Sequence, residues 1–236
     1  MHSIDNQRIS RNQLFHFIDR NKTILEIGPA CGPSFRGALV SYFDVVQIDN
    51  CPEITYLSHT GDLSIIKDKK FDYCFSSHNF EHLFDIVLHL QNISQLMIRP
   101  GYYFLAIPDY RYCFDHFKSP TSIVDVMLAY QNKEGYTLKQ HLERALMCHN
   151  DAGAHWRGDH GNVLNDDFKK RFFDLMESYN ANPLNWIDNH KWYFCSENFR
   201  FVMTALRKLE VIDFDVKVVT QTAQDSLEFY AILGVA

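Results

Sequence analysis

The stretch ILEIGPACGPSF, residues 24–35, combines residue types that suit a loop around a small ligand. Gly28 and Gly32 let the backbone approach a ligand closely, because they carry no Cβ. Pro33 suits the first position of a helix, where free N–H groups attract a carboxylate or a phosphate. Asp49 lies about 20 residues beyond Gly28, the spacing at which a carboxylate binds ribose hydroxyls. This spacing predicts a site for a nucleoside-like ligand.

The same stretch argues against a nicotinamide dinucleotide. A pyrophosphate-binding turn needs the pattern G-x-G-x-x-G/A, and here the three positions hold Gly28, Ala30 and Pro33. Glu26 adds a carboxylate just before the turn, which would repel a pyrophosphate and attract a positive charge. These features favour a nucleoside that carries an amino acid, with Glu26 facing its ammonium group. An NAD-dependent oxidoreductase is the weaker alternative.

Histidines form a second group of chemically capable residues, and six of the 12 lie between Asp109 and Lys191. Histidine titrates near neutral pH and can act as a general base for an alcohol nucleophile. The expected catalytic residues are His116, His155 and Asp109, and the expected substrate contacts are Tyr110, Arg111, Arg157 and His160. A purely structural role for these histidines is the alternative. Their spacings differ from zinc-site patterns, so we assign them no metal site and leave metal dependence open.

Alternating strand and helix patterns must position both groups. Strands are expected at residues 23–28, 45–50, 54–62, 71–77 and 102–109. Helices are expected near residues 14–18 and at 33–43, 84–98, 121–131, 138–149 and 196–209, the last with Ser196 as N-cap. Residues 211–220 and 226–235 should close the sheet as an antiparallel hairpin. The pattern predicts one α/β domain over residues 1–236, with a mostly parallel sheet and an inserted helical lid at 110–190.

Composition limits the class of protein. The chain of 236 residues has 46% apolar and 22% charged residues, which is typical of a globular domain. Its formal net charge of −6 gives no basic surface for nucleic acid. The polar N-terminus has no signal-peptide pattern, and no stretch has the length of a membrane span. The six cysteines form no C-x-x-C pair. We therefore expect reduced cysteines and a soluble, cytoplasmic protein.

Several motifs resemble those of one known family. LEIGPACG resembles motif I of the class I S-adenosylmethionine-dependent methyltransferases (type 11-like), whose Rossmann-like sheet has seven strands. The other matching stretches, in order, are Asp49, GDL at 61–63, FDYCFSSHNFEHL at 71–83, LMIRPGYYFLAIPD at 96–109 and EFYAILG at 228–234. The chain departs from the pattern at Ala30 and Tyr102, where the family has glycine. EIGP and IPDYRYCFDHF also resemble a bacterial subgroup associated with surface-glycan biosynthesis.

The resemblance covers residues 22–109 and 196–234 and implies S-adenosylmethionine as cofactor. The residues that it implies for the cofactor site are Glu26, Gly28, Pro29, Ala30, Gly32, Asp49, Asn50, Asp62, Leu63, Ser77, His78 and His82. The expected reaction is O-methylation of a sugar or glycan-linked group in polysaccharide biosynthesis. The expected partner is a small molecule or glycan, with no nucleic acid and an open oligomeric state. The alternative is a non-catalytic module that keeps the fold and binds the cofactor or a partner.

Overall fold

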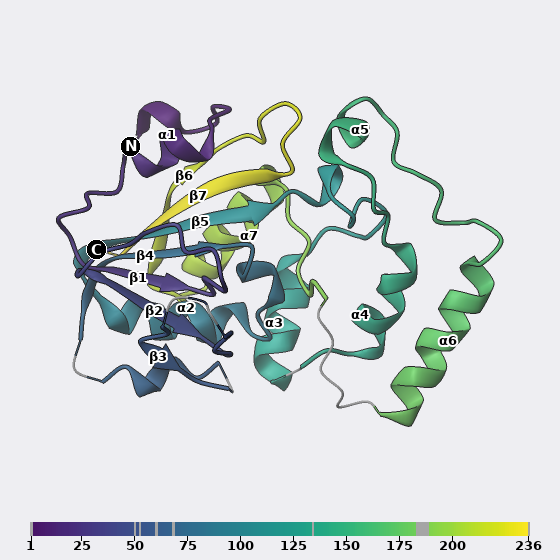
Figure 1. Cartoon of the computed structure of the whole chain (residues 1–236), viewed down its shortest axis with the longest axis horizontal. Coiled ribbons are helices and arrows are strands. Elements are labelled where there is room, and N and C mark those ends of the chain that lie inside the picture. Colours follow the sequence, from purple (N-terminus) through teal and green to yellow (C-terminus); the bar gives the residue numbers. More distant parts are fainter. Residues whose placement is uncertain are drawn as a thin grey trace.

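The computed structural model describes residues 2–49, 51, 53–59, 61–67, 69–133, 135–182 and 189–235. In these residues seven strands form one sheet in the order β3-β2-β1-β4-β5-β7-β6 (Figure 1). The strands are β1 Ile24–Ile27, β2 Val40–Asp44, β3 Tyr56–Leu57, β4 Phe71–Ser77, β5 Met97–Pro108, β6 Phe214–Val219 and β7 Glu228–Val235. Strands β1 to β5 pair in parallel, and β7 lies antiparallel between β5 and β6. The predicted α/β fold with an antiparallel closing hairpin is confirmed.

Helices cover both faces of the sheet. They are α1 Arg11–Phe15, α2 Ile86–Leu96, α3 Ile123–Asn132, α4 Leu138–Glu143, α5 Ala152–Trp156, α6 Phe168–Ala181 and α7 Ser196–Lys208. Buried side chains of α2, α3 and α7 belong to the core of one face, and Leu14 of α1 belongs to the core of the other. Figure 1 shows α4, α5 and α6 on the side toward which the parallel strands point. No helix in the described ranges has the length and apolar character needed to cross a membrane.

Local sequence explains the elements that were predicted. The side chain of Asp85 accepts a hydrogen bond from the Leu88 N–H (2.9 Å) and starts α2. The helix then buries Ile86, Leu90 and Ile93 along one stripe, as helical periodicity requires. At α7 the N-cap is Cys195 rather than Ser196, because the Cys195 N–H donates to the Asn198 side chain. The predicted cap was therefore wrong by one residue.

The segment between β1 and β2 differs from the prediction. Residues 28–39 form no helix, and the next strand is Val40–Asp44 instead of 45–50. The carboxylate of Glu26 accepts hydrogen bonds from the N–H groups of Ser34 (2.7 Å) and Phe35 (3.2 Å). The Phe35 ring packs on Phe15 and Phe75, with centroid distances of 5.0 and 5.1 Å. These contacts satisfy and anchor the loop without helical hydrogen bonds, so the expectations of a helix at 33–43 and a strand at 45–50 were wrong.

Candidate functional site

Two loops meet at the carboxyl edge of β1 and β4. Gly28 has φ +66°, and a Cβ placed there would lie 2.5 Å from Nδ2 of Asn79. A larger residue there would force the Asn79 side chain to move and would adopt a backbone conformation that favours glycine. Ala30 (φ 43°) and His78 (φ 49°) are non-glycine residues in the left-handed region. Such strained backbone concentrates at ligand sites, and this edge is the candidate site.

Glu26 lies beneath the first loop rather than in open space. Its side chain is 2% exposed, and its oxygens accept hydrogen bonds from the N–H groups of Ser34 and Phe35 in the loop. Burial raises the pKa of Glu26, although those two N–H groups act in the opposite direction. The predicted contact of Glu26 with an ammonium group stays a prediction. Pro29 is buried beside it, whereas Ala30 and Gly32 are exposed.

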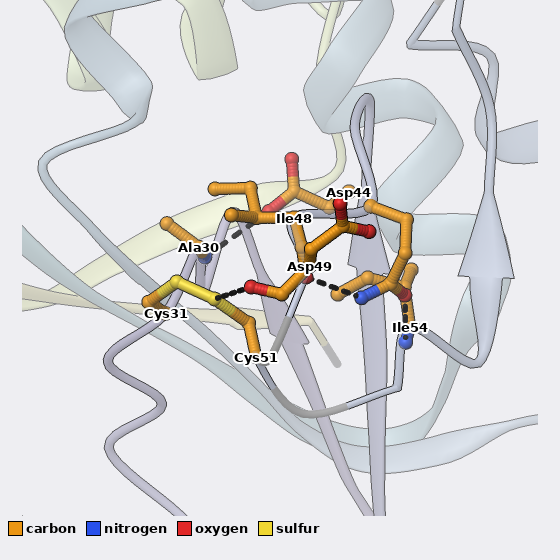
Figure 2. The surroundings of a disulfide bond; sticks show 8 residues. Ala30, Cys31, Asp44, Ile48, Asp49, Cys51 and Ile54 are labelled. Atoms are coloured by element: carbon orange, nitrogen blue, oxygen red, sulfur yellow. Dashed lines mark hydrogen bonds between the residues drawn. A yellow bond between two sulfur atoms is a disulfide. The ribbon is translucent and has the colours of Figure 1, made fainter.

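The acid at the end of β2 is Asp44, five residues before the expected Asp49. One Asp44 oxygen accepts a hydrogen bond from the Ala30 N–H (3.1 Å), and the other accepts one from the Val45 N–H (2.7 Å). Asp49 lies exposed in the loop that follows β2 (Figure 2). Because the strand ends earlier, the acid beside motif I is Asp44. Asn50 lies outside the described residues.

A disulfide joins the same two loops. Cys31 and Cys51 are bonded, with their Cα atoms 4.8 Å apart (Figure 2). The expectation that all six cysteines are reduced was therefore wrong for this pair. The missing helix is the reason, because an irregular loop after β1 brings Cys31 against the loop after β2. The other four, Cys74, Cys113, Cys148 and Cys195, are free.

The residues predicted to meet an adenine ring have structural partners. Asp62 accepts a hydrogen bond from the Ser64 N–H (2.9 Å) and caps the short 3-10 helix η2, Leu63–Ile65. The Leu63 side chain is 1% exposed and belongs to the core. Ser77 ends β4 and is half-buried. The adenine contact stays a prediction.

A cavity of about 300 Å³ lies beyond the carboxyl ends of β4 and β5. Its lining residues are His78, Glu81, His82, Pro108, Cys113, Phe114, His149, Asn150, His190 and Leu227. Open α/β sheets bind ligands in this position, and the volume is at the lower end for ligand pockets. The cavity joins strand ends to the segment between β5 and α7.

One wall of the cavity carries a charged hydrogen-bond network. Glu228, at the start of β7, accepts hydrogen bonds from His78 Nε2 (2.8 Å), the Tyr230 hydroxyl (2.7 Å) and Arg11 Nε (3.1 Å). Burial opposes the charge of Glu228, but these three donors outweigh it and lower the pKa to about 2. Burial likewise disfavours the charged imidazole of His78, yet Glu228 and Glu81 raise its pKa.

The predicted catalytic histidines come together away from the cavity lining. Nδ1 of His155 lies 3.0 Å from Nδ1 of His160, and the rings of His116 and His160 stack with centroids 3.6 Å apart. His116 Nδ1 contacts the Arg111 carbonyl oxygen at 2.7 Å. Burial and the two neighbouring imidazoles lower the pKa of His155. We call His116, His155 and His160 the histidine trio.

The other predicted residues divide between structural partners and the surface. Asp109 is fully buried, accepts two hydrogen bonds from the Arg111 side chain (2.9 and 2.7 Å) and one from Thr222 Oγ1 (2.6 Å). The Tyr110 N–H donates to the Phe194 carbonyl (2.9 Å), and Arg157 is exposed. Asp109 and Arg111 therefore fix the chain segment that follows the end of β5.

Sequence reasoning missed Glu81, His149 and His190 as cavity residues. Glu81 lies within the quoted motif at residues 71–83, where only Ser77, His78 and His82 were selected. That motif was the one available signal, because His190 and His149 reach the cavity only through tertiary structure.

No family model matches the chain, and no curated protein matches it. Several similar solved structures are S-adenosylmethionine-dependent methyltransferases. One from Mesorhizobium loti is 12% identical, with 94% of this chain and 96% of that chain covered and a TM-score of 0.44. The CurJ carbon methyltransferase is 11% identical, with 94% and 51% covered and a TM-score of 0.42. The trans-methyltransferase CalH, in complex with SAH, is 13% identical, with 91% and 51% covered and a TM-score of 0.40. The chain spans about half the length of CurJ and CalH, and the likeness is one of distant overall fold.

Proposed function

We propose that the chain is an S-adenosylmethionine-dependent methyltransferase that acts on an oxygen of a sugar or glycan-linked group. The observation that carries the proposal is the position of the cavity, beyond β4 and β5. Its lining includes His78, which directly precedes Asn79, the residue that Gly28 approaches. The sheet order, with β7 antiparallel between β5 and β6, and the ordered motifs support it.

The residues at the carboxyl edge of the sheet fit a nucleoside cofactor, with one change in the residues assigned to it. The missing Cβ at Gly28 lets the Asn79 side chain pack against the backbone of the first loop, so a larger residue there would displace Asn79 and disturb the edge. Asp44 is the acid that we assign to the ribose hydroxyls, with Asp49 as the alternative from the sequence. The cofactor would supply a methyl group on a positively charged sulfur. The absence of a helix in residues 28–39 removes the helix start that a pyrophosphate would use, which further disfavours an NAD enzyme.

The chain's own residues would orient the acceptor and take up its proton. Phe114 offers an aromatic face on which a sugar ring can pack, and His149 lies on the same wall. The ring centroids of these two residues are 5.8 Å apart. Because the histidine trio does not line the cavity, we propose His149 as the general base in place of His116 or His155. We expect α4 to α6 to act as the lid, and a cytoplasmic location stays a prediction.

Calorimetric titration with S-adenosylmethionine and with its demethylated product tests the cofactor. We expect the wild type to bind both and Gly28→Ala to bind at least about tenfold more weakly, a loss of about 1.4 kcal/mol. Gly135→Ala is the matched control, because a Cβ at Gly135 meets nothing within 4 Å. Failure of the wild type to bind either compound would reject the proposal.

Methyl transfer to nucleotide sugars and polysaccharide fragments, read by mass spectrometry, tests the acceptor. His149→Ala should lower kcat by about 100-fold or more, whereas His116→Ala should leave kcat within a few-fold of the wild type. A larger loss of kcat in His116→Ala than in His149→Ala would indicate that the general base belongs to the histidine trio.

A non-catalytic module is the second candidate. The observation that favours it is the placement of His116, His155 and His160 outside the cavity lining. It predicts cofactor binding with no methyl transfer to any compound in the same screen, and turnover of one acceptor would exclude it.

A further inference from the structure

We propose that Glu81, His82 and His190 bind a divalent transition-metal ion in the cavity, with Zn²⁺ as the best-suited ion. Two imidazoles and one carboxylate suit zinc and its first-row neighbours. All three residues line the cavity. A metal held there would leave coordination positions open toward the ligand that the cavity accepts.

The distances between the three groups suit a shared ion. Oε1 of Glu81 lies 3.9 Å from Nε2 of His82 and 3.7 Å from Nε2 of His190. One potential ligand atom from each residue lies within 4.8 Å of the others. Two ligands of a tetrahedral zinc, each at about 2.1 Å, are roughly 3.4 Å apart. Movements of a few tenths of an ångström in the side chains would complete such a site.

Glu81 is the strongest reason to expect a cation. Its side chain is 0% exposed, and neither carboxylate oxygen accepts a hydrogen bond from any described residue. A buried carboxylate without such partners is costly, because it has lost its hydration. The surrounding imidazole nitrogens lie too far away for hydrogen bonds. A metal ion bound between them would compensate the charge.

Asp115 orients the ring of His190. His190 Nδ1 lies 2.5 Å from Oδ2 of Asp115, a carboxylate that can only accept, so Nδ1 carries the proton. In a singly protonated ring the lone pair of Nε2 then faces Oε1 of Glu81, 3.7 Å away. A cation between these two atoms would bind both. A carboxylate that orients a histidine through its second nitrogen is typical of metal sites.

The backbone holds the three ligands in register. Phe80, Glu81 and His82 form the short 3-10 helix η3, and the fully buried Phe80 ring packs on Phe194 and Phe199. The carbonyl oxygen of Glu81 accepts hydrogen bonds from the N–H groups of Lys191 (2.8 Å) and Trp192 (3.1 Å). The segment that carries His190 is thus tied directly to the residue that it faces.

The histidine trio is the rival site, and it provides the matched control. It contains no carboxylate, and His155 and His160 already contact each other through their Nδ1 atoms. Glu81 has no comparable partner, so we assign the ion to the cavity. The assignment does not depend on the proposed methyltransferase activity, because metal binding is measured without a methyl donor.

The experiment is titration of chelator-treated full-length protein with Co²⁺, followed by visible absorption and by displacement with Zn²⁺. We expect one tight ion per chain in the wild type and in His160→Gln. Glu81→Gln and, separately, His82→Gln should lose the tight site. Asp115→Asn should weaken it by about 10- to 100-fold, as loss of an orienting carboxylate does. Near-UV circular dichroism identifies the variants that fold, and only these are compared.

Three results would overturn the assignment: no tight ion in the wild type, full affinity in a folded Glu81→Gln or His82→Gln variant, or loss of the ion in His160→Gln. The last would move the site to the histidine trio. Calorimetry with S-adenosylmethionine on the same samples separates this result from the proposed function, because cofactor binding without metal binding rejects only the metal site.

Discussion

Replacement of Glu228 by glutamine should destabilise the protein in a pH-dependent manner. The Glu228 side chain is 12% exposed and accepts hydrogen bonds from His78, Tyr230 and Arg11. These donors lower its pKa from the ordinary 4.5 to about 2. At 1.36 kcal/mol per pH unit, the ionised carboxylate contributes about 3 kcal/mol to the free energy of unfolding at pH 7.

The direction of the pH dependence follows from the lowered pKa. A carboxylate with a depressed folded-state pKa stabilises the protein above its unfolded-state pKa, near 4.5. That stabilisation is lost as the pH falls through about 2, where folded Glu228 takes up a proton. At pH 3 the linkage relation predicts that Glu228 still contributes about 1 kcal/mol to the free energy of unfolding. The difference between wild type and Glu228→Gln should shrink accordingly.

Urea unfolding of both proteins at pH 7 and pH 3 measures this difference. Glu177→Gln on α6 is the control, since Glu177 is exposed and its replacement should change stability by less than about 0.5 kcal/mol. A Glu228→Gln difference that is equal at the two pH values would refute the reasoning, because packing rather than charge would then account for it. A difference below about 1 kcal/mol at pH 7 would refute it as well.

Three further predictions concern the loops and a helix start. Cys31→Ser should lower the free energy of unfolding by about 3 kcal/mol in urea titrations, because the disulfide closes a loop with a sequence separation of 20; reductant should have the same effect on the wild type and little on Cys31→Ser. Asp44→Asn should weaken cofactor binding in calorimetry by about tenfold or more, whereas Asp49→Asn should have a smaller effect; the opposite order would restore the acid expected from the sequence. Asp85→Ala should cost about 1 kcal/mol in thermal unfolding, because it removes the cap of α2; an unchanged stability would contradict that role.

Local pattern was sufficient for most of the fold. Strand β4 was predicted at its observed bounds. The polar residues on either side of a mostly apolar run indicate where such a strand begins and ends. The closing hairpin of β6 and β7 was likewise readable from two apolar runs with a short turn. The irregular segment after β1 was not predicted, because two hydrogen bonds to the Glu26 side chain take the place of helical ones. A side-chain contact of this kind, between residues eight and nine positions apart, leaves no periodic pattern in the sequence. The acid Asp44 and the Cys31–Cys51 pair follow from the same change.

The sequence by itself determined the α/β sheet, its closing hairpin and the edge where a ligand would lie, since periodicity and glycine positions act over a few residues. Only the tertiary structure decided which side chains meet at that edge. Glu81 faces His190 because the carbonyl of Glu81 binds the backbone of the segment that follows His190. The trio of His116, His155 and His160, in contrast, is held by its own ring contacts. Such pairings depend on residues far apart in the chain, and their physical cause is the packing of the folded protein.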